Sequence, residues 1–292
     1  MKRIPLILFW ILTATLVCSA QTTFYYPHVA DGVQSGGTSW KTTIFLTNPA
    51  ASGTASGTIT FTQENSTVGG AGSAFNLSFT DQAGAPAGSG NVIPFSIPGG
   101  QTRKYVSAGN TAYAGGFATV TTTAGTVSGT ALFSEFGPSG RLIGEAGVPS
   151  VPAVAKQVIF VDTAGGFNIG VAYANPGPSA AAVTLSLINA SGVSVLPTVG
   201  QNLGPGNHSA SFTSGIFPTA AQLTGTMQIS STTPLAAIAL RFDPTFTVFT
   251  TLPPVTLASL INPAMEWLQQ RAWLTPLTSV ARLLGAFQWR LG

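Results

Sequence analysis

The chain has 292 residues, of which 45% are hydrophobic and 7% are charged, and its formal net charge is +3. The abundance of apolar residues, which alternate with Thr and Ser, excludes a disordered chain, and a bundle of membrane-spanning helices is excluded because the only long apolar run is N-terminal. The 34 glycines and 20 prolines instead predict an all-β protein with many short strands and tight turns.

The positive charge comes from the two ends of the chain. Residues 21–255 contain six basic and seven acidic side chains, whereas residues 1–20 and 256–292 together contain five basic and one acidic. A nearly neutral body lacks the basic surface that tracks a phosphate backbone, which disfavours nucleic acid as a partner.

Residues 1–20 have the three parts of a signal peptide. Lys2 and Arg3 precede an apolar run at 4–17, and small residues at 18–20 suit cleavage after Ala20. A retained membrane anchor is the alternative, although the run is shorter than a full span. The single cysteine, Cys18, is either a lipidation site or, as we favour, lost with the signal. We therefore expect an extracellular or cell-envelope protein without thiols.

Period-two alternation predicts the strands of a first unit, residues 21–150. Its longer loops are expected at 31–39, 65–73 and 81–90, where Gly, Asn and Ser cluster. The last two strands flank Ala124-Gly125 and are predicted to pair as a hairpin. The predicted strands are 24–28, 42–47, 58–63, 75–79, 92–97, 102–106, 115–122 and 127–136.

A second unit, residues 151–255, repeats the order of the first. The segment 145–156 carries two prolines and is predicted to be the linker between them. The second unit also ends in two strands predicted to form a hairpin, here around 232–234. Its predicted strands are 157–161, 167–175, 183–188, 208–212, 225–230 and 235–242.

One ten-residue stretch shows the duplication most clearly. WKTTIFLTNP at 40–49 returns as FNIGVAYANP at 167–176, so that Trp40 corresponds to Phe167 and Asn48 to Asn175. Because proline removes an N–H and keeps the preceding residue extended, each strand is expected to end at Asn-Pro.

The strand count favours an all-β fold of two tandem homologous antiparallel β-sandwich domains with immunoglobulin-like architecture. The similarity is architectural, since the cysteine pair and the core tryptophan of immunoglobulins are missing, and a barrel or jelly roll is the alternative.

Residues 256–292 lie outside the duplication and are predicted to be a short helical or disordered tail. They contain three of the five tryptophans, and apolar residues recur at helical spacing after Pro276. Three interpretations stay open: the tail docks on a membrane surface or a partner, packs on the second unit, or is a poorly ordered extension.

Motifs for catalysis or metal binding are missing from the sequence. It has no G-x-S-x-G elbow, and its glycine clusters do not open a helix after a strand. The two histidines, His28 and His208, fall at non-equivalent places in the two units, which disfavours a metal site, and the His208 ring is expected at the surface. Glu135 and Glu145 flank a loop, but nothing pairs them for acid–base catalysis. The sequence thus predicts no enzyme, no cofactor and no metal.

The best candidates for a ligand contact are Trp40, His28 and Asp31. His28 and Asp31 could share a hydrogen bond, and Trp40 could stack on a sugar ring. For Trp40 the structural alternative is favoured, in which it packs at the edge of its sandwich, because Phe167 occupies the same place in the second unit. Asp31 and Gly32 could equally form only a turn.

Five short strings resemble uncharacterised secreted β-sandwich repeat proteins of environmental bacteria. They are YPHVADG at 26–32, LTNP at 46–49, EAGVP at 145–149, VAYANP at 171–176 and FTTLP at 249–253. The resemblance covers about residues 24–253 and implies an envelope or extracellular module without catalytic residues.

These observations give two functional hypotheses. The first is a non-catalytic structural spacer or adhesion module whose partners are other envelope or extracellular proteins or surface glycans. The second is a carbohydrate-binding module that uses Trp40 and neighbouring aromatic residues.

Overall fold

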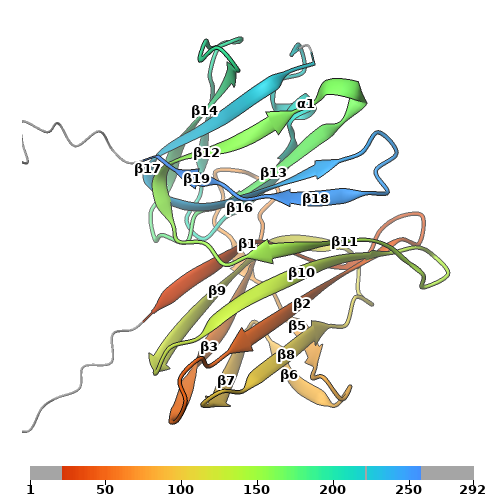
Figure 1. Ribbon diagram of the computed structural model, residues 1–292, viewed down its shortest axis with the longest axis vertical. Coiled ribbons are helices and arrows are strands. Elements are labelled where there is room, and N and C mark those ends of the chain that lie inside the picture. The colour runs from red at the N-terminus through yellow and green to blue at the C-terminus, as the bar shows by residue number, and fades with distance from the viewer. Residues whose placement is uncertain (1–21, 221, 258–292) are drawn as a thin grey trace, which may run out of the picture.

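The computed structural model describes residues 22–220 and 222–257 and confirms an all-β protein of antiparallel sheets, consistent with a β-sandwich (Figure 1). The predicted signal peptide and residues 258–292 of the predicted tail lie outside the described residues. The first two tail positions belong to the fold, because Thr256 pairs with Gln157 and the Leu257 N–H donates to Lys156 O. Neither of the helices in the described part is long and apolar enough to span a membrane.

The N-terminal half forms two layers that share their first strand. A register shift between Tyr26 and Val29 bends β1, which pairs first with β9 and then with β2. One layer consists of β1 (Thr23–Val33), β9 (Ala114–Ala124), β3 (Thr54–Gln63), β4 (Ser73–Ala74) and β7 (Val92–Pro98). The other consists of β2 (Ser39–Thr47), β8 (Thr102–Ser107), β5 (Leu77–Thr80), β6 (Pro86–Gly90), β10 (Ser128–Phe136) and β11 (Leu142–Pro149).

The C-terminal half also has two layers, and one long strand passes through both. This strand, β17 (Thr224–Phe242), pairs with β12 and β14 over its first part and with β13 and β18 over its second. The outer layer contains β12 (Val154–Asp162), β14 (Ala181–Asn189), β15 (Val199–Leu203) and β19 (Val255–Thr256). We call the other layer the inner sheet; it contains β13 (Asn168–Ala174), β16 (His208–Phe212), residues 236–242 of β17 and β18 (Phe249–Leu252). The helical turns η1 (Ala164–Gly166) and α1 (Thr213–Ile216) complete this half.

The order of strand pairing recurs between the halves. β2 lies between β8 and β10, and β13 lies between β16 and the second part of β17. Likewise β3 lies between β7 and β9, and β14 lies between β15 and the first part of β17.

Both predicted hairpins are wrong. β9 and β10 belong to different layers, and residues 232–234 lie inside the continuous strand β17. A turn residue between two alternating runs marks a change of direction. It does not tell whether the next run returns beside its neighbour or crosses to the facing sheet.

The predicted linker is also mostly strand. Residues 145–149 belong to β11 and residues 154–156 to β12, which leaves only 150–153 as the connection. Val151 exchanges two backbone hydrogen bonds with Tyr25, of 2.9 and 3.0 Å, so even this connection is tied to β1. Parts of two predicted loops are strand as well, since β1 continues to Val33 and β6 occupies 86–90.

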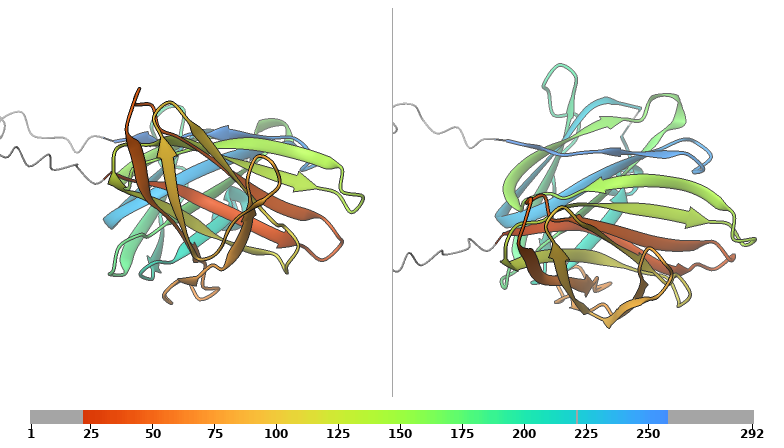
Figure 2. Two further views of the ribbon diagram at one scale, coloured as in Figure 1. Left: turned by 90° about the horizontal axis from the view of Figure 1, so that it is seen from below. Right: turned by 60° about the horizontal axis from the view of Figure 1, so that its bottom comes forward.

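The centre of the inner sheet, on β13 and residues 236–242 of β17, is buried on both faces and packs the two halves together. Figures 1 and 2 show the halves lying against each other. Val171 and Tyr173 point into the C-terminal core. Ala172 on the same strand and Ile238 opposite it pack with the N-terminal core. At the sheet edge, β18 meets β11, where the Thr251 hydroxyl donates to Gly147 O.

The two Asn-Pro positions make equivalent buried corners. Asn48 Nδ2 donates to Ile97 O at 2.9 Å, and Asn175 Nδ2 donates to Leu203 O at 3.2 Å, in each case tying the end of one strand to the end of another. Asn175 makes two further bonds, to Ser179 O (2.8 Å) and Gly204 O (3.0 Å). Proline ends each strand as expected, and the asparagine side chain satisfies the backbone carbonyls left open there.

We predict that Asn175→Ala lowers the free energy of unfolding by about 2–3 kcal/mol, because it leaves buried carbonyls without a donor. The matched control is Asn202→Ala, at an exposed position of β15, which should change stability by less than about 0.5 kcal/mol. Urea denaturation curves of both variants measure the difference. Equal effects would show that the corner contributes nothing specific.

Candidate functional site

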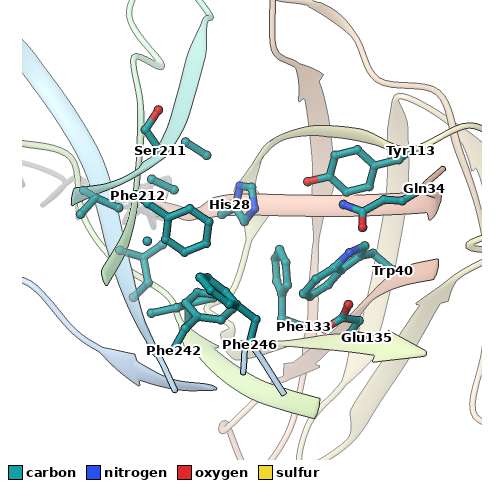
Figure 3. A pocket seen from close by; sticks show the side chains of 16 residues that line it. His28, Gln34, Trp40, Tyr113, Phe133, Glu135, Ser211, Phe212, Phe242 and Phe246 are labelled. Carbon is teal, nitrogen blue, oxygen red and sulfur yellow. The ribbon is translucent and has the colours of Figure 1, made fainter. Parts of the chain in front are cut away.

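A cavity of about 320 Å³ lies where the inner sheet meets the N-terminal half (Figure 3). This volume is at the lower end of the range for small-molecule sites, which often lie between domains. From the N-terminal half the cavity is lined by His28, Gln34, Trp40, Tyr113, Phe133 and Glu135. From the C-terminal half the main lining side chains are Ala172, Ser211, Phe212, Ile238, Leu240, Phe242 and Phe246.

Strand register places Trp40 at the cavity. On β2 every second residue faces the N-terminal core, where Ile44 and Leu46 are fully buried, and continuing the alternation toward the start of the strand leads to Trp40. Glu135 on β10 is directly opposite Trp40, and Phe133 lies two residues before it on the same face. Directly opposite residues share a face, so these three side chains extend the core pattern into the cavity wall.

The inner sheet supplies an aromatic wall. Phe212 and Phe242 meet edge to face at 5.3 Å between ring centroids. Gly170 lies beside both, and a Cβ there would come within 3.2 Å of the Phe242 ring. A glycine at this position therefore lets the two rings close over the strand.

Loop 243–248 adds Phe246 to this wall in a strained conformation. Phe246 has φ of 57°, in the left-handed region that bulky residues rarely adopt, and its ring contacts Phe212 at 5.3 Å. The Asp243 carboxylate holds the loop by accepting hydrogen bonds from the Thr245 hydroxyl and from the N–H groups of Thr245, Thr247 and Val248. These bonds, the Thr245 hydroxyl first, lower the pKa of Asp243 to about 2.

The two histidines, one from each half, meet beside the cavity. His28 Nδ1 lies 3.0 Å from His208 Nε2, and His208 Nδ1 lies 2.8 Å from Glu64 Oε2. The His28 ring is stacked between Phe133 and His208, at 4.7 and 4.9 Å. Burial, together with the neighbouring His208, lowers the pKa of His28 well below its ordinary value.

The prediction that the His208 ring lies at the surface is wrong, because a distant segment covers it. Residues 65–72 pack backbone against backbone on 204–207, so close that a Cβ on Gly204 would be 2.0 Å from Gly70 O. Asn207, fully buried, accepts from the Asn65 N–H at 2.8 Å and donates to Val68 O at 2.9 Å. This contact places Glu64 and His208 side by side.

The structure brings two of the three predicted ligand contacts together. Trp40 and His28 line the same cavity, whereas the Asp31 carboxylate is buried elsewhere and accepts from the Gly109 N–H at 2.9 Å. Burial raises the pKa of Asp31, against hydrogen bonds from Ser107 and Gly109 that lower it. The predicted hydrogen bond between His28 and Asp31 is absent, since the His28 ring bonds to His208 instead.

Trp40 and Phe167 have different surroundings despite their equivalent positions in the sequence. Trp40 packs between Phe133, at 5.4 Å, and Phe249 of the other half, at 5.8 Å. Its Nε1 is buried and hydrogen-bonds to none of the described residues. Phe167 lies outside this cavity, with the guanidinium of Arg241 3.5 Å above its ring.

Sequence reasoning missed Glu64, Tyr113 and the inner-sheet wall. A signal for the wall exists: 171–174 (VAYA) and 235–240 (LAAIAL) lack the alternating Thr and Ser of strands such as 58–63, which is typical of strands buried on both faces. Nothing local marks Tyr113, which lies in the turn before β9. Burial, reinforced by the Glu64 charge, raises the pKa of its hydroxyl to about 12.

The acidic groups near the cavity are not paired with one another. Burial raises the pKa of Glu135. Glu145, on the other side of the turn, accepts a hydrogen bond of 2.5 Å from the Ser134 hydroxyl on the opposite face of the sheet, so the two carboxylates do not share a site. Within residues 22–220 and 222–257, no group of three or more His, Cys, Asp or Glu residues is arranged to hold a metal ion. The cavity thus combines aromatic walls with a few isolated polar atoms.

Comparison of the chain with protein-family models, with curated proteins and with solved structures finds no match. A functional assignment therefore depends on the residues of the site.

We predict that the Asp243 hydrogen bonds hold Phe246 in place down to strongly acidic pH. The folded-state pKa of Asp243 is depressed from 3.8 to about 2, so its contribution is complete above about pH 4 and is lost as pH falls through 2. In an NMR titration, the amide signals of Thr247 and Val248 should move with a midpoint near 2. Asp243→Ala should shift them already at pH 7, and a wild-type midpoint near 4 would contradict the prediction.

Proposed function

We propose that residues 21–150 and 151–255 are two tandem homologous β-sandwich domains of immunoglobulin-like architecture, preceded by a signal peptide at 1–20. Two observations support the homology: the recurring order of strand pairing and the equivalent buried corners at Asn48 and Asn175. The first unit adds β5 and β6 beyond β8, where the second has only the short α1 after β16.

We further propose that the chain is an exported, non-catalytic binding protein of the cell envelope or extracellular space. Its resemblance to secreted β-sandwich repeat proteins supports this location. Its ligand is a small ring-shaped molecule held in the cavity between the halves. The observation that carries this proposal is the convergence of Trp40, His28 and the inner-sheet phenylalanines on one cavity. Mostly apolar cavities with a few placed polar groups are the usual form of a small-molecule site.

The two ends of the cavity differ in chemistry. Gln34, Tyr113 and Glu135 gather near Trp40, while Phe212, Phe242 and Phe246 form the opposite side (Figure 3). A matching ligand has an apolar ring face and a hydroxylated edge, as a sugar unit of a surface glycan or a phenol has. Binding to glycans through this cavity would also make the protein an adhesion module.

The position of the chain ends supports a tethered module over a spacer. Tyr25 bridges to Val151 and Thr256 pairs with Gln157, so the beginning and the end of the described chain meet the same short stretch. Both ends leave on one side of the molecule (Figures 1 and 2). A spacer in series would have them at opposite ends.

The test compares Trp40→Ala with Phe167→Ala, which removes the corresponding aromatic ring outside the cavity. Thermal shift and saturation-transfer NMR against a panel of monosaccharides, cyclic alcohols and phenols should find a ligand for the wild type. Trp40→Ala should weaken its binding at least tenfold because the ring-stacking surface is lost, and Phe167→Ala should leave affinity within about twofold. Binding that is absent for every class, or equal in both variants, would sink the proposal.

A further inference from the structure

Glu64, His208 and His28 form a hydrogen-bonded chain, and the carboxylate at its end fixes the tautomer of both imidazole rings. A carboxylate only accepts, so the contact of 2.8 Å requires the proton of His208 to be on Nδ1. When both imidazoles are neutral, His208 Nε2 is then an acceptor, and His28 must donate to it from Nδ1 across 3.0 Å. His28 Nε2 is left with a lone pair, and no described residue hydrogen-bonds to it.

One added proton reverses the hydrogen-bonding role of His28 Nε2. If the proton is on His208, its Nε2–H donates to His28 Nδ1, and the neutral His28 carries its own proton on Nε2. If the proton is on His28, both of its nitrogens carry hydrogen. Either way His28 Nε2 changes from an acceptor to a donor, whichever ring holds the charge.

Building on the proposed function, we propose that His28 Nε2 is the polar anchor of the cavity and accepts a hydrogen bond from a hydroxyl group of a neutral ring compound. The ligand class is a phenol or a cyclic alcohol, with the ring against the aromatic wall. A proton entering the Glu64–His208–His28 chain abolishes the preference for a hydroxyl donor.

The other ionisable groups around His28 favour a neutral ligand. Glu135 lines the cavity and Glu64 closes the far end of the chain, so an anion would be repelled from two sides. Tyr113 faces the same space, and with its pKa raised to about 12 it stays an uncharged phenol. No lysine or arginine is among the described residues that line the cavity.

Two probes of nearly equal shape test the ligand class: 4-methylphenol, and 4-methylanisole, in which a methyl group replaces the hydroxyl hydrogen. At pH 8 the phenol should bind at least tenfold more tightly, because only its hydroxyl can donate to His28 Nε2. His28→Phe keeps a ring beside Phe133 and should abolish this preference, while Phe167→Ala should keep it. Equal binding of both probes at pH 8 overturns the inference and leaves the proposed function standing. Binding of neither probe also overturns the inference, while the proposed function is decided by the full panel of monosaccharides, cyclic alcohols and phenols.

A second measurement needs no ligand. The chain has only two histidines, so long-range ¹H–¹⁵N spectra of the untagged, ¹⁵N-labelled protein resolve both rings. At pH 8 both should be protonated on Nδ1, and Glu64→Gln should allow Nε2 protonation to appear because an amide can donate as well as accept. Two rings protonated on Nε2 in the wild type would overturn the inference.

Discussion

The double burial of the inner sheet is the constraint on which the rest of the structure depends. One face of β13 closes the C-terminal core through Val171 and Tyr173, and the other lies against the N-terminal half through Ala172. Small residues on that second face let the halves approach closely, and the aromatic side chains at one end of it prevent complete closure. The cavity is the space that remains between the small and the large residues.

At this junction His208 is buried and His28 half-buried, which is costly unless their ring nitrogens form hydrogen bonds. The chain that ends at Glu64 meets this requirement for three of the four nitrogens. The His208 side chain is fully buried while Glu64 keeps 38% of its side chain exposed, so the carboxylate is at the solvent side and the ring inside. The remaining nitrogen, His28 Nε2, belongs to a residue of the cavity wall and adds a hydrogen-bond acceptor to the aromatic side of the site.

Local patterns predict most strands but not their partners. The alternation at 58–63 and the Asn-Pro stops are local properties, and β3, β2 and β13 follow them closely. The crossing from β9 to β10 depends on which sheet the next strand joins, which no local residue encodes. The histidine chain joins residues 144 and 180 positions apart in the sequence, so Trp40 and His28 could be proposed as contacts while Glu64 and His208 could not.

Duplicated position does not imply duplicated role. Trp40 and Phe167 lie at the start of equivalent strands, yet only Trp40 faces the other half. The C-terminal half packs its inner sheet against the N-terminal half, and the two halves are not related by symmetry across this contact. Phe167 instead lies under Arg241, whose guanidinium is held by Asp162 at 2.7 Å. The scaffold explains why both positions are aromatic, since each must cover the end of a sandwich. The asymmetry of packing explains why only Trp40 borders the cavity between the halves. The binding site is therefore a product of how the two halves pack and is not repeated in the second half.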